Sequence, residues 1–174
     1  IMIGETRDAE TAEISVRSAI TGHLVVSTLH TNDAISSIVR LADMGVAPYL
    51  ISNSVVGIVA QRLVRKVCQF CKYEEPATAE DIAIVGDGIP MITRGKGCKV
   101  CNNTGYKGRI SIHEMVYIDK TLKRMIARSA DSQEMLEYAK KTQGMRSLMD
   151  SAIDLVKEGV TTPEEVMKIA YYSD

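Results

Sequence analysis

Two kinds of apolar spacing alternate along the first third of the chain. Residues 1–4 and 24–29 are short apolar runs of the length typical of buried strands. Between them, apolar side chains recur at helical spacing from Asp8, a good N-cap, to Ile20, and Gly22 follows as a stop. A strand, a helix and a strand within about 30 residues predict a βαβ unit, and therefore an α/β fold with a parallel sheet.

The pattern after this unit is mostly helical. A helix from about residue 33 to 44, capped by Asn32 or Thr31, is expected to precede a largely apolar helix from Pro48 to about Leu63. Further helices are expected over 79–85, 120–128, 132–142, 147–157 and 163–171.

The remaining segments are of a different kind. The stretch 72–97 contains the short helix at 79–85 and then a loop with Gly and Pro. Residues 109–118 read as a strand, with Ile110, Ile112 and Met115 as the expected inward side chains. These patterns divide the chain into an α/β part (1–66), a cysteine-containing element (67–108) and a mostly helical region (109–174).

Composition narrows the class of protein. The chain has 174 residues, 45% hydrophobic and 25% charged, and its 21 basic and 22 acidic side chains give a net charge of −1. This is a globular balance without a general attraction to nucleic acid or to an anionic membrane. Ile1, Met2 and Ile3 open the chain as if inside a buried strand, so we expect a fragment of a longer protein.

The four cysteines form two Cys-x-x-Cys pairs. They stand at Cys68, Cys71, Cys98 and Cys101. Paired thiolates at this spacing favour a closed tetrahedral zinc site of structural type over a disulfide or a single redox pair. Gly97 and Gly105 flank the second pair and would let backbone amides turn toward sulfur. Free buried thiols are the alternative interpretation, although they do not usually come as two matched pairs.

A carboxylate and an imidazole follow the two predicted parallel strands. Gly4 and Glu5 end the first strand, and Thr28 and His30 end the second. Because ligands bind at the carboxyl edge of open α/β sheets, Glu5 could hold magnesium or orient an attacking water, and His30 could contact a terminal phosphate. His23, at the opposite end of its strand, is less suited to that site. A solvated Glu5 and a helix-capping His30 remain alternatives at this point.

The sequence lacks one component of ATP chemistry. The phosphate-binding loop Gly-x4-Gly-Lys-Ser/Thr does not occur in the 174 residues. Without its backbone amides to hold the β- and γ-phosphates, we expect this chain alone not to hydrolyse ATP efficiently.

The motifs together resemble those of one family. Residues 1–12, which contain Gly4-Glu5-Thr6-Arg7-Asp8, resemble the Walker B segment of the GspE/PilB-like ATPases of type II secretion and type IV pilus assembly, although Thr6 stands where that family often has an aliphatic residue. Residues 21–34 resemble their histidine box, and residues 101–109 resemble the end of their tetracysteine element.

This resemblance implies the C-terminal part of a RecA-like P-loop ATPase. The full-length protein would be a homohexamer that binds ATP and Mg²⁺ at the cytoplasmic face of the bacterial inner membrane and drives a platform protein there. It implies that Glu5 is the Walker B glutamate, that His23 and His30 are histidine-box residues, and that the four cysteines bind Zn²⁺. Candidates for phosphate or subunit contacts are Arg7, Arg17 and Arg62, for which surface ion pairs are equally compatible.

Two other classes of function stay open. A zinc-ribbon module that grips nucleic acid through its lysines is disfavoured by the net charge of −1 and by the lack of interleaved aromatic residues. A zinc element that docks a partner protein is compatible with the motor assignment.

Overall fold

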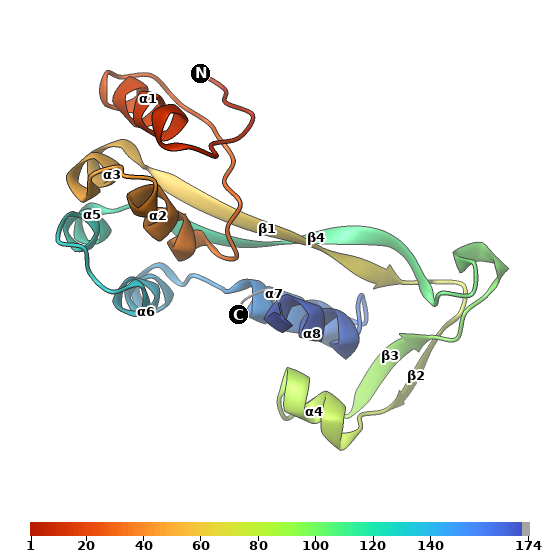
Figure 1. The fold of residues 1–174 in the computed structure, drawn as a ribbon. Helices are drawn as coiled ribbons and strands as arrows, with labels where there is room; N and C mark the ends of the chain where they lie inside the picture. Colours follow the sequence, from red (N-terminus) through yellow and green to blue (C-terminus); the bar gives the residue numbers. More distant parts are fainter. Residues whose placement is uncertain (172–174) are drawn as a thin grey trace. The chain divides into compact units, whose positions relative to one another are not determined.

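The computed structural model describes residues 1–171 (Figure 1). The elements, in chain order, are α1 (Ala9–Ile20), α2 (Ala34–Asp43), α3 (Pro48–Ser54), β1 (Gly57–Val67), β2 (Lys72–Pro76), α4 (Ala79–Val85), β3 (Met91–Gly95), the 3-10 turn η1 (Lys99–Cys101), β4 (Tyr106–Tyr117), α5 (Lys120–Ala127), α6 (Ser132–Gln143), α7 (Leu148–Lys157) and α8 (Pro163–Tyr171). Strands β1 and β4 pair in one two-stranded sheet, and β2 pairs with β3 in another. No helix of this described part is both long and apolar enough to cross a bilayer.

The chain forms two compact units. The first contains Ile1–Ala60 and Glu114–Met145, and the second contains Gln61–His113 and the stretch from 146 to 171. Each unit therefore draws on two separated stretches, and β1 and β4 each continue from one unit into the other. The division by sequence into 1–66, 67–108 and 109–174 is a different partition and stays a prediction about functional parts.

The core of the first unit is aliphatic and lies among its helices. Its fully buried side chains come from α1, α2, α3, β4, α5 and α6, and include Ala12, Ile51, Val116 and Leu122. Since the chain has no Trp and a single Phe, aliphatic side chains and methionines make up the buried core of this unit.

The two predicted parallel strands pair, but only over a short stretch. Met2 and Val26 form an isolated parallel bridge, and the Ile3 and Thr6 amides donate to the Val26 and Thr28 carbonyls, both at 2.8 Å. With α1 between the two segments, the parallel strand–helix–strand order is confirmed. The expectation of two full strands is wrong. The two segments pair only with each other, over a few residues, and among the described residues no further strand pairs with either of them.

Side-chain caps set the helix starts. Asp8 accepts the Thr11 amide at 2.8 Å, as expected for α1. Helix α2 starts one residue later than expected, because its N-cap is Asp33, whose carboxylate accepts the Ser36 amide at 2.7 Å, and not Asn32 or Thr31. The predicted helices at 79–85, 120–128, 132–142, 147–157 and 163–171 are confirmed to within a residue at each end.

The long helix expected from Pro48 to about Leu63 is wrong. Helix α3 stops at Ser54, and residues 57–67 form β1 instead. Val55, Val56, Ile58 and Val59 are β-branched, which disfavours the helix and suits a strand. Burial along β1 alternates over most of its length, as expected for a strand with one covered face.

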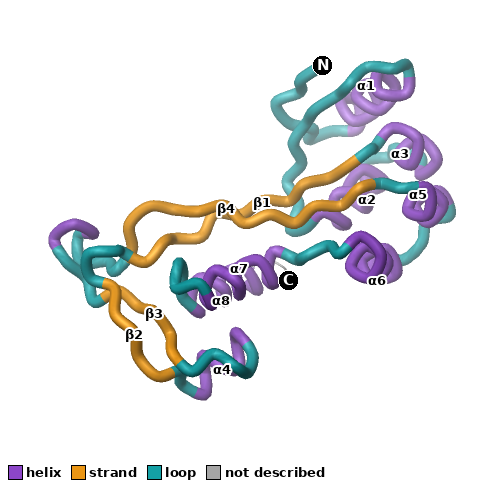
Figure 2. Tube along the Cα trace, turned by 180° about the vertical axis from the view of Figure 1, so that it is seen from behind, coloured by secondary structure: helices purple, strands orange, loops and turns teal. Residues whose placement is uncertain are grey.

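Two details of the other strands also differ from expectation. The loop expected after residue 85 contains β3, which pairs antiparallel with β2 from Lys72–Gly95 to Pro76–Met91. Figure 2 shows the two strands side by side, and α4 lies in the connection of this β2–β3 hairpin. In β4 the inward side chains are Ile112, Glu114 and Val116, whereas Met115 is 64% exposed. Every second residue of this strand faces inward, and one of these positions is the charged residue Glu114. A choice of inward positions by hydrophobicity alone therefore selected Met115 wrongly.

An ion cluster ties the hairpin of the second unit to its helices. Arg94 of β3 donates to both carboxylate oxygens of Asp81 on α4, at 2.8 and 2.9 Å, and also pairs with Glu75 and Glu164. Asp81 is almost fully buried and Arg94 is mostly buried. Such a cluster fixes geometry, since each buried charge has an opposite partner.

A second buried carboxylate joins α8 to β1. Glu165 accepts the Arg65 amide at 2.8 Å and two hydrogen bonds from the Arg65 guanidinium at 2.8 and 2.9 Å, and Lys168 adds another at 2.7 Å. The Arg65 guanidinium also stacks on Tyr106, 3.9 Å from the ring centroid. Burial opposes the charged form of Glu165, but the bonds from Arg65 and Lys168 prevail and lower its pKa below the usual 4.5.

Replacing Glu165 with Gln should therefore lower the free energy of unfolding by about 1–3 kcal/mol at neutral pH, because charge-assisted bonds to Arg65 are lost. Because the pKa of Glu165 is lower in the folded than in the unfolded state, its contribution to stability is complete above the unfolded pKa of 4.5. That contribution is lost as the pH falls through the folded-state pKa. The difference between wild type and Glu165→Gln should accordingly close below pH 4.5. Denaturant titrations at several pH values measure this.

Glu158→Gln, at an exposed carboxylate after α7, is the matched control and should change stability little at any pH. An equal deficit for Glu165→Gln at neutral and acidic pH would show that the stabilisation is not ionic.

Candidate functional site

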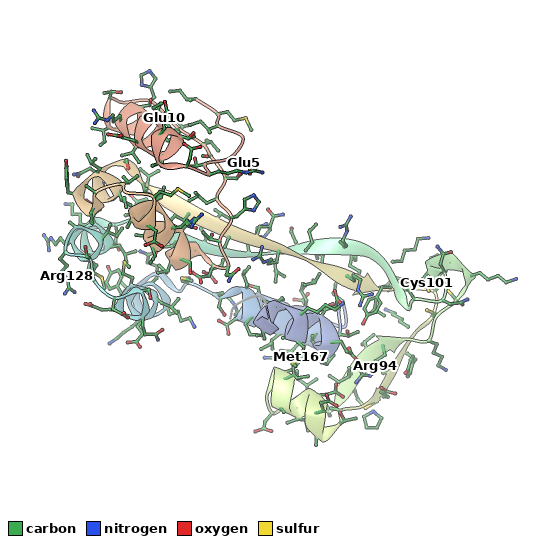
Figure 3. The ribbon with its side chains drawn as sticks, viewed as in Figure 1. Glu5, Glu10, Arg94, Cys101, Arg128 and Met167 are labelled. Carbon is green, nitrogen blue, oxygen red and sulfur yellow. The ribbon has the colours of Figure 1, made fainter. Side chains whose placement is uncertain are left out.

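The four cysteines converge on one point of the second unit, where Figure 3 labels Cys101. Their sulfur atoms all lie within 4.8 Å of one another. The Cys68–Cys98 and Cys71–Cys101 pairs are each 3.9 Å apart, and Cys98–Cys101 is 3.8 Å apart. A tetrahedron with Zn–S bonds of about 2.3 Å has edges of about 3.8 Å, so these residues fit a four-thiolate zinc site without an open position.

Backbone amides already point at the sulfurs, as the flanking glycines predicted. The backbone of Gly97 hydrogen-bonds Cys71, that of Gly105 hydrogen-bonds Cys101, and the Cys98 amide donates to Cys101 Sγ at 3.2 Å. Gly97 and Gly105 have φ of +90° and +77°, and an added Cβ on either would lie within 2.8 Å of a backbone oxygen. Larger residues would not fit at these two positions.

The electrostatics of the cluster favour a cation at its centre. Burial raises the pKa of the Cys71 thiol to about 12. At Cys101 burial also opposes ionisation, but backbone hydrogen bonds from Cys98 and Gly105 outweigh it and lower the pKa to about 6. Four thiolates within 4.8 Å of one another would repel strongly, and a divalent ion such as Zn²⁺ balances this charge in four-cysteine sites.

The carboxylate and the imidazole singled out by sequence are in contact in the first unit. Glu5 Oε2 lies 3.0 Å from His30 Nε2 and 2.6 Å from Arg7 Nε. Figure 3 labels Glu5 on the segment that leads into α1. Hydrogen bonds from Arg7 and then from His30 lower the pKa of Glu5 below its ordinary value, so this carboxylate is ionised at neutral pH.

Hydroxyl groups fix the two segments that carry this pair. Thr28 Oγ1 donates to the Gly4 carbonyl at 2.6 Å, and Thr6 Oγ1 and Ser27 Oγ are hydrogen-bonded at 2.8 Å. Thr6 is 4% exposed. The buried hydroxyl of Thr6 is thus satisfied by a neighbour on the paired segment.

A hollow of about 370 Å³ lies beside the pair. It is lined by Thr6, Arg7, His30, Arg40 and Met44. Sequence reasoning missed Arg40 and Met44, although a signal existed. Arg40 lies in α2 and Met44 is its C-cap, four residues later, so the two side chains lie on the same side of the helix that follows His30.

The other candidates lie elsewhere. His23 contacts the Ser18 carbonyl, at 3.2 Å from Nδ1, and the Thr21 hydroxyl at the end of α1. Arg17 pairs with Glu13 one turn earlier, which is the surface ion pair considered for it. Arg62 lies on β1 in the second unit and is half-buried, and its proposed nucleotide role stays a prediction.

Solved structures of a pilus retraction motor and of the ATPase DotB share this fold. The pilus retraction motor PilT with bound ADP superposes with a TM-score of 0.66 at 24% identity, over 97% of this chain and 38% of that chain. The Legionella pneumophila ATPase DotB gives a TM-score of 0.62 at 20% identity, over 98% of this chain and 38% of that chain. At these identities the likeness defines the class of fold.

The chain belongs to the family described as Type II/IV secretion system protein, whose model matches residues 1–168. It is 45% identical to type II secretion system protein E of Pseudomonas aeruginosa, over 97% of this chain and 34% of the relative. It is 42% identical to the type IV pilus assembly ATPase PilB of Thermus thermophilus, over 96% of this chain and 19% of the relative. The chain thus spans about a third of the length of the first relative and about a fifth of the second.

The geometry of the cysteine cluster predicts the result of metal removal. A strong chelator should release one zinc per chain and unfold residues 67–108, because binding energy at such sites is largely folding energy. Hydrogen exchange should show lost protection there, while helices α1 and α5 of the first unit stay protected.

Cys98→Ser should reproduce the chelator's effect in zinc-supplemented buffer, and Ser18→Ala is the matched hydroxyl control in the other unit. Undiminished protection of residues 67–108 after complete chelation would exclude a structural metal.

Proposed function

We propose that this chain is the part of a type II secretion or type IV pilus assembly ATPase that supplies the Walker B carboxylate and the histidine-box imidazole to the nucleotide site. The observation that carries the proposal is the 3.0 Å contact between Glu5 and His30. The two residues are 25 positions apart, and each lies in a segment that resembles a motif of this family. An accidental surface pair would not require two anchored segments in parallel.

The geometry at Glu5 suits the handling of water or Mg²⁺. Arg7 and His30 both bind Oε2, which leaves Oε1 without a protein partner among residues 1–171. An ionised carboxylate with one oxygen fixed and the other open can orient a water for attack on the γ-phosphate, or hold Mg²⁺ directly or through water. Mg²⁺ supplies charge neutralisation when ATP is bound.

His30 is oriented by the same contact. Because its Nε2 faces a carboxylate, that nitrogen carries a proton, and Nδ1 remains for a second contact. The His30 side chain is 83% exposed, so it can reach a ligand that enters the hollow beside Arg7 and Arg40. These cationic and polar groups match the charge of a phosphate.

The exposed strand residues support a RecA-like core in a larger protein. Met2 is 87% exposed, Leu24 74% and Val26 54%, although all three lie in segments that read as central strands. Apolar strands of parallel sheets are normally covered on both faces. We propose that other parts of the full-length protein cover them and contribute the phosphate-binding loop for ATP.

The higher organisation follows from the same assignment. The full-length protein would work as a homohexamer at the cytoplasmic face of the bacterial inner membrane and would pass its motion to a platform protein there. The zinc would be structural and would hold the arm of residues 67–108, and no nucleic acid would be involved.

The surface of the zinc arm favours a second, compatible role in docking a partner protein. Phe70 is 74% exposed and Val100 43% exposed, each between the two cysteines of a pair. Residues 66–73 and 95–113 contain no acidic side chain, and their basic residues are Lys66, Lys72, Lys96, Lys99, Lys107 and Arg109. An exposed apolar tip with a basic surround suits an acidic protein segment.

Charge reversal at this arm should separate docking from catalysis. Lys72→Glu with Lys99→Glu should weaken binding to an acidic platform segment about tenfold or more at low salt while turnover is kept, because rim charges set association. Lys120→Glu with Lys123→Glu, on α5, is the matched control. Steeply salt-dependent DNA binding that the arm variant abolishes would instead favour the nucleic-acid alternative.

The catalytic assignment predicts the effect of one isosteric change. Glu5→Gln in the full-length protein should lower ATP turnover by about 100-fold or more, because an amide cannot accept the proton or hold the charge that the carboxylate does. Nucleotide affinity should change little. Steady-state hydrolysis and equilibrium binding of a fluorescent ATP analogue measure the two effects.

Glu10→Gln, an exposed carboxylate on α1, is the control and should retain full turnover. Normal hydrolysis by Glu5→Gln would remove the basis of the proposal.

A further inference from the structure

A buried carboxylate from a distant strand lies behind the histidine segment. Glu114 of β4 is 3% exposed and stands between Ile112 and Val116 on the covered face of the strand, where an apolar residue would be expected. Burying a charge costs free energy unless strong partners compensate. A charged residue in such a position therefore indicates a specific task.

Glu114 caps the start of α2. The amide of Ala34, the first residue of that helix, donates to Glu114 Oε1 at 2.9 Å, and Ala34 is fully buried. The N-cap Asp33 already serves the Ser36 amide, so the two carboxylates satisfy different N–H groups of the first turn. Negative charge at this end is also favoured by the helix dipole.

Ala34 is four residues beyond His30, and the segment between the two is short and anchored at both ends. On one side Thr28 is bonded to the Gly4 carbonyl. On the other side Thr31 Oγ1 is bonded to Ser37 Oγ at 2.8 Å, and Glu114 holds Ala34. The position of the imidazole against Glu5 thus depends on where this second anchor places the start of α2.

We propose that Glu114 is a positioning residue for His30: by capping the Ala34 amide from β4, it fixes the start of α2 and so the distance between His30 and Glu5. The proposal rests on the proposed function, in which His30 works at the nucleotide site. It assigns a role to an acidic residue that stands 80 positions from Ala34 in sequence and does not line the hollow.

The test uses the full-length protein and measures two quantities in the same sample. Hydrogen exchange measures how well the backbone amides of residues 27–37 are protected. ATP turnover measures the effect of that local order on catalysis. Glu114→Ala should raise exchange in 27–37 about tenfold relative to α5, and lower kcat about tenfold with a nearly unchanged KM. Glu114→Gln keeps an acceptor oxygen and should restore most of both.

Met115→Ala, the exposed neighbour on the same strand, is the matched control and should change neither quantity. If Glu114→Ala does not fold, Ala34→Pro removes the donor instead. Proline is well tolerated at the first helical position, and the extended φ of −144° at Asp33 suits a residue before proline. Ala34→Pro should loosen 27–37 in the same way.

A double variant separates positioning from general stability. In a His30→Ala background, Glu114→Ala should lower kcat by less than about twofold, because its effect acts through the missing imidazole. A full further loss in that background, or unchanged exchange of 27–37 in Glu114→Ala, would overturn the proposal. Normal turnover of His30→Ala alone would instead contradict the role of His30, while the exchange result would still decide whether Glu114 holds the segment.

Discussion

The candidate site depends on the pairing of two short segments in parallel. Hydrogen bonds from Ile3 and Thr6 to the carbonyls of Val26 and Thr28 align the end of one segment with the end of the other. Since the pairing is parallel, the side chains that follow each segment lie at the same edge. That alignment brings Glu5 and His30 to 3.0 Å, and the bond from Thr28 to Gly4 prevents the two from slipping past each other.

The helices and the site pair were predictable from sequence because their signals are local. Asp8, Thr78, Asp119 and Ser147 cap helices where sequence places helix starts, and each bonds an amide two or three residues ahead. The cysteine spacing and the Glu5 and His30 motifs are likewise local. Contact between motifs then followed from one assumption, a parallel pairing of adjacent strands.

The errors arose where tertiary context decides. Residues 55–59 form a continuous apolar run, whose spacing fits a buried helix as well as a strand. Their β-branched side chains favour the strand, and pairing with β4 completes it. The β2–β3 hairpin is held by ion pairs of Arg94 with Asp81 of α4 and with Glu164. No local sequence pattern predicts these contacts. Glu114 was invisible because its partner, Ala34, is 80 residues away.

The cysteine cluster has a consequence for how the arm can vary. Cys71 precedes and Cys98 follows the stretch 72–97, so both ends of that stretch lie at the cysteine cluster. The entropy of closing a loop grows only slowly with its length, by about 0.6 kcal/mol for each doubling. Insertions at the turn near Asp87 and Gly88 would therefore lengthen the arm at small energetic cost, which makes this segment a place where related chains can diverge in size without disturbing what lies on either side.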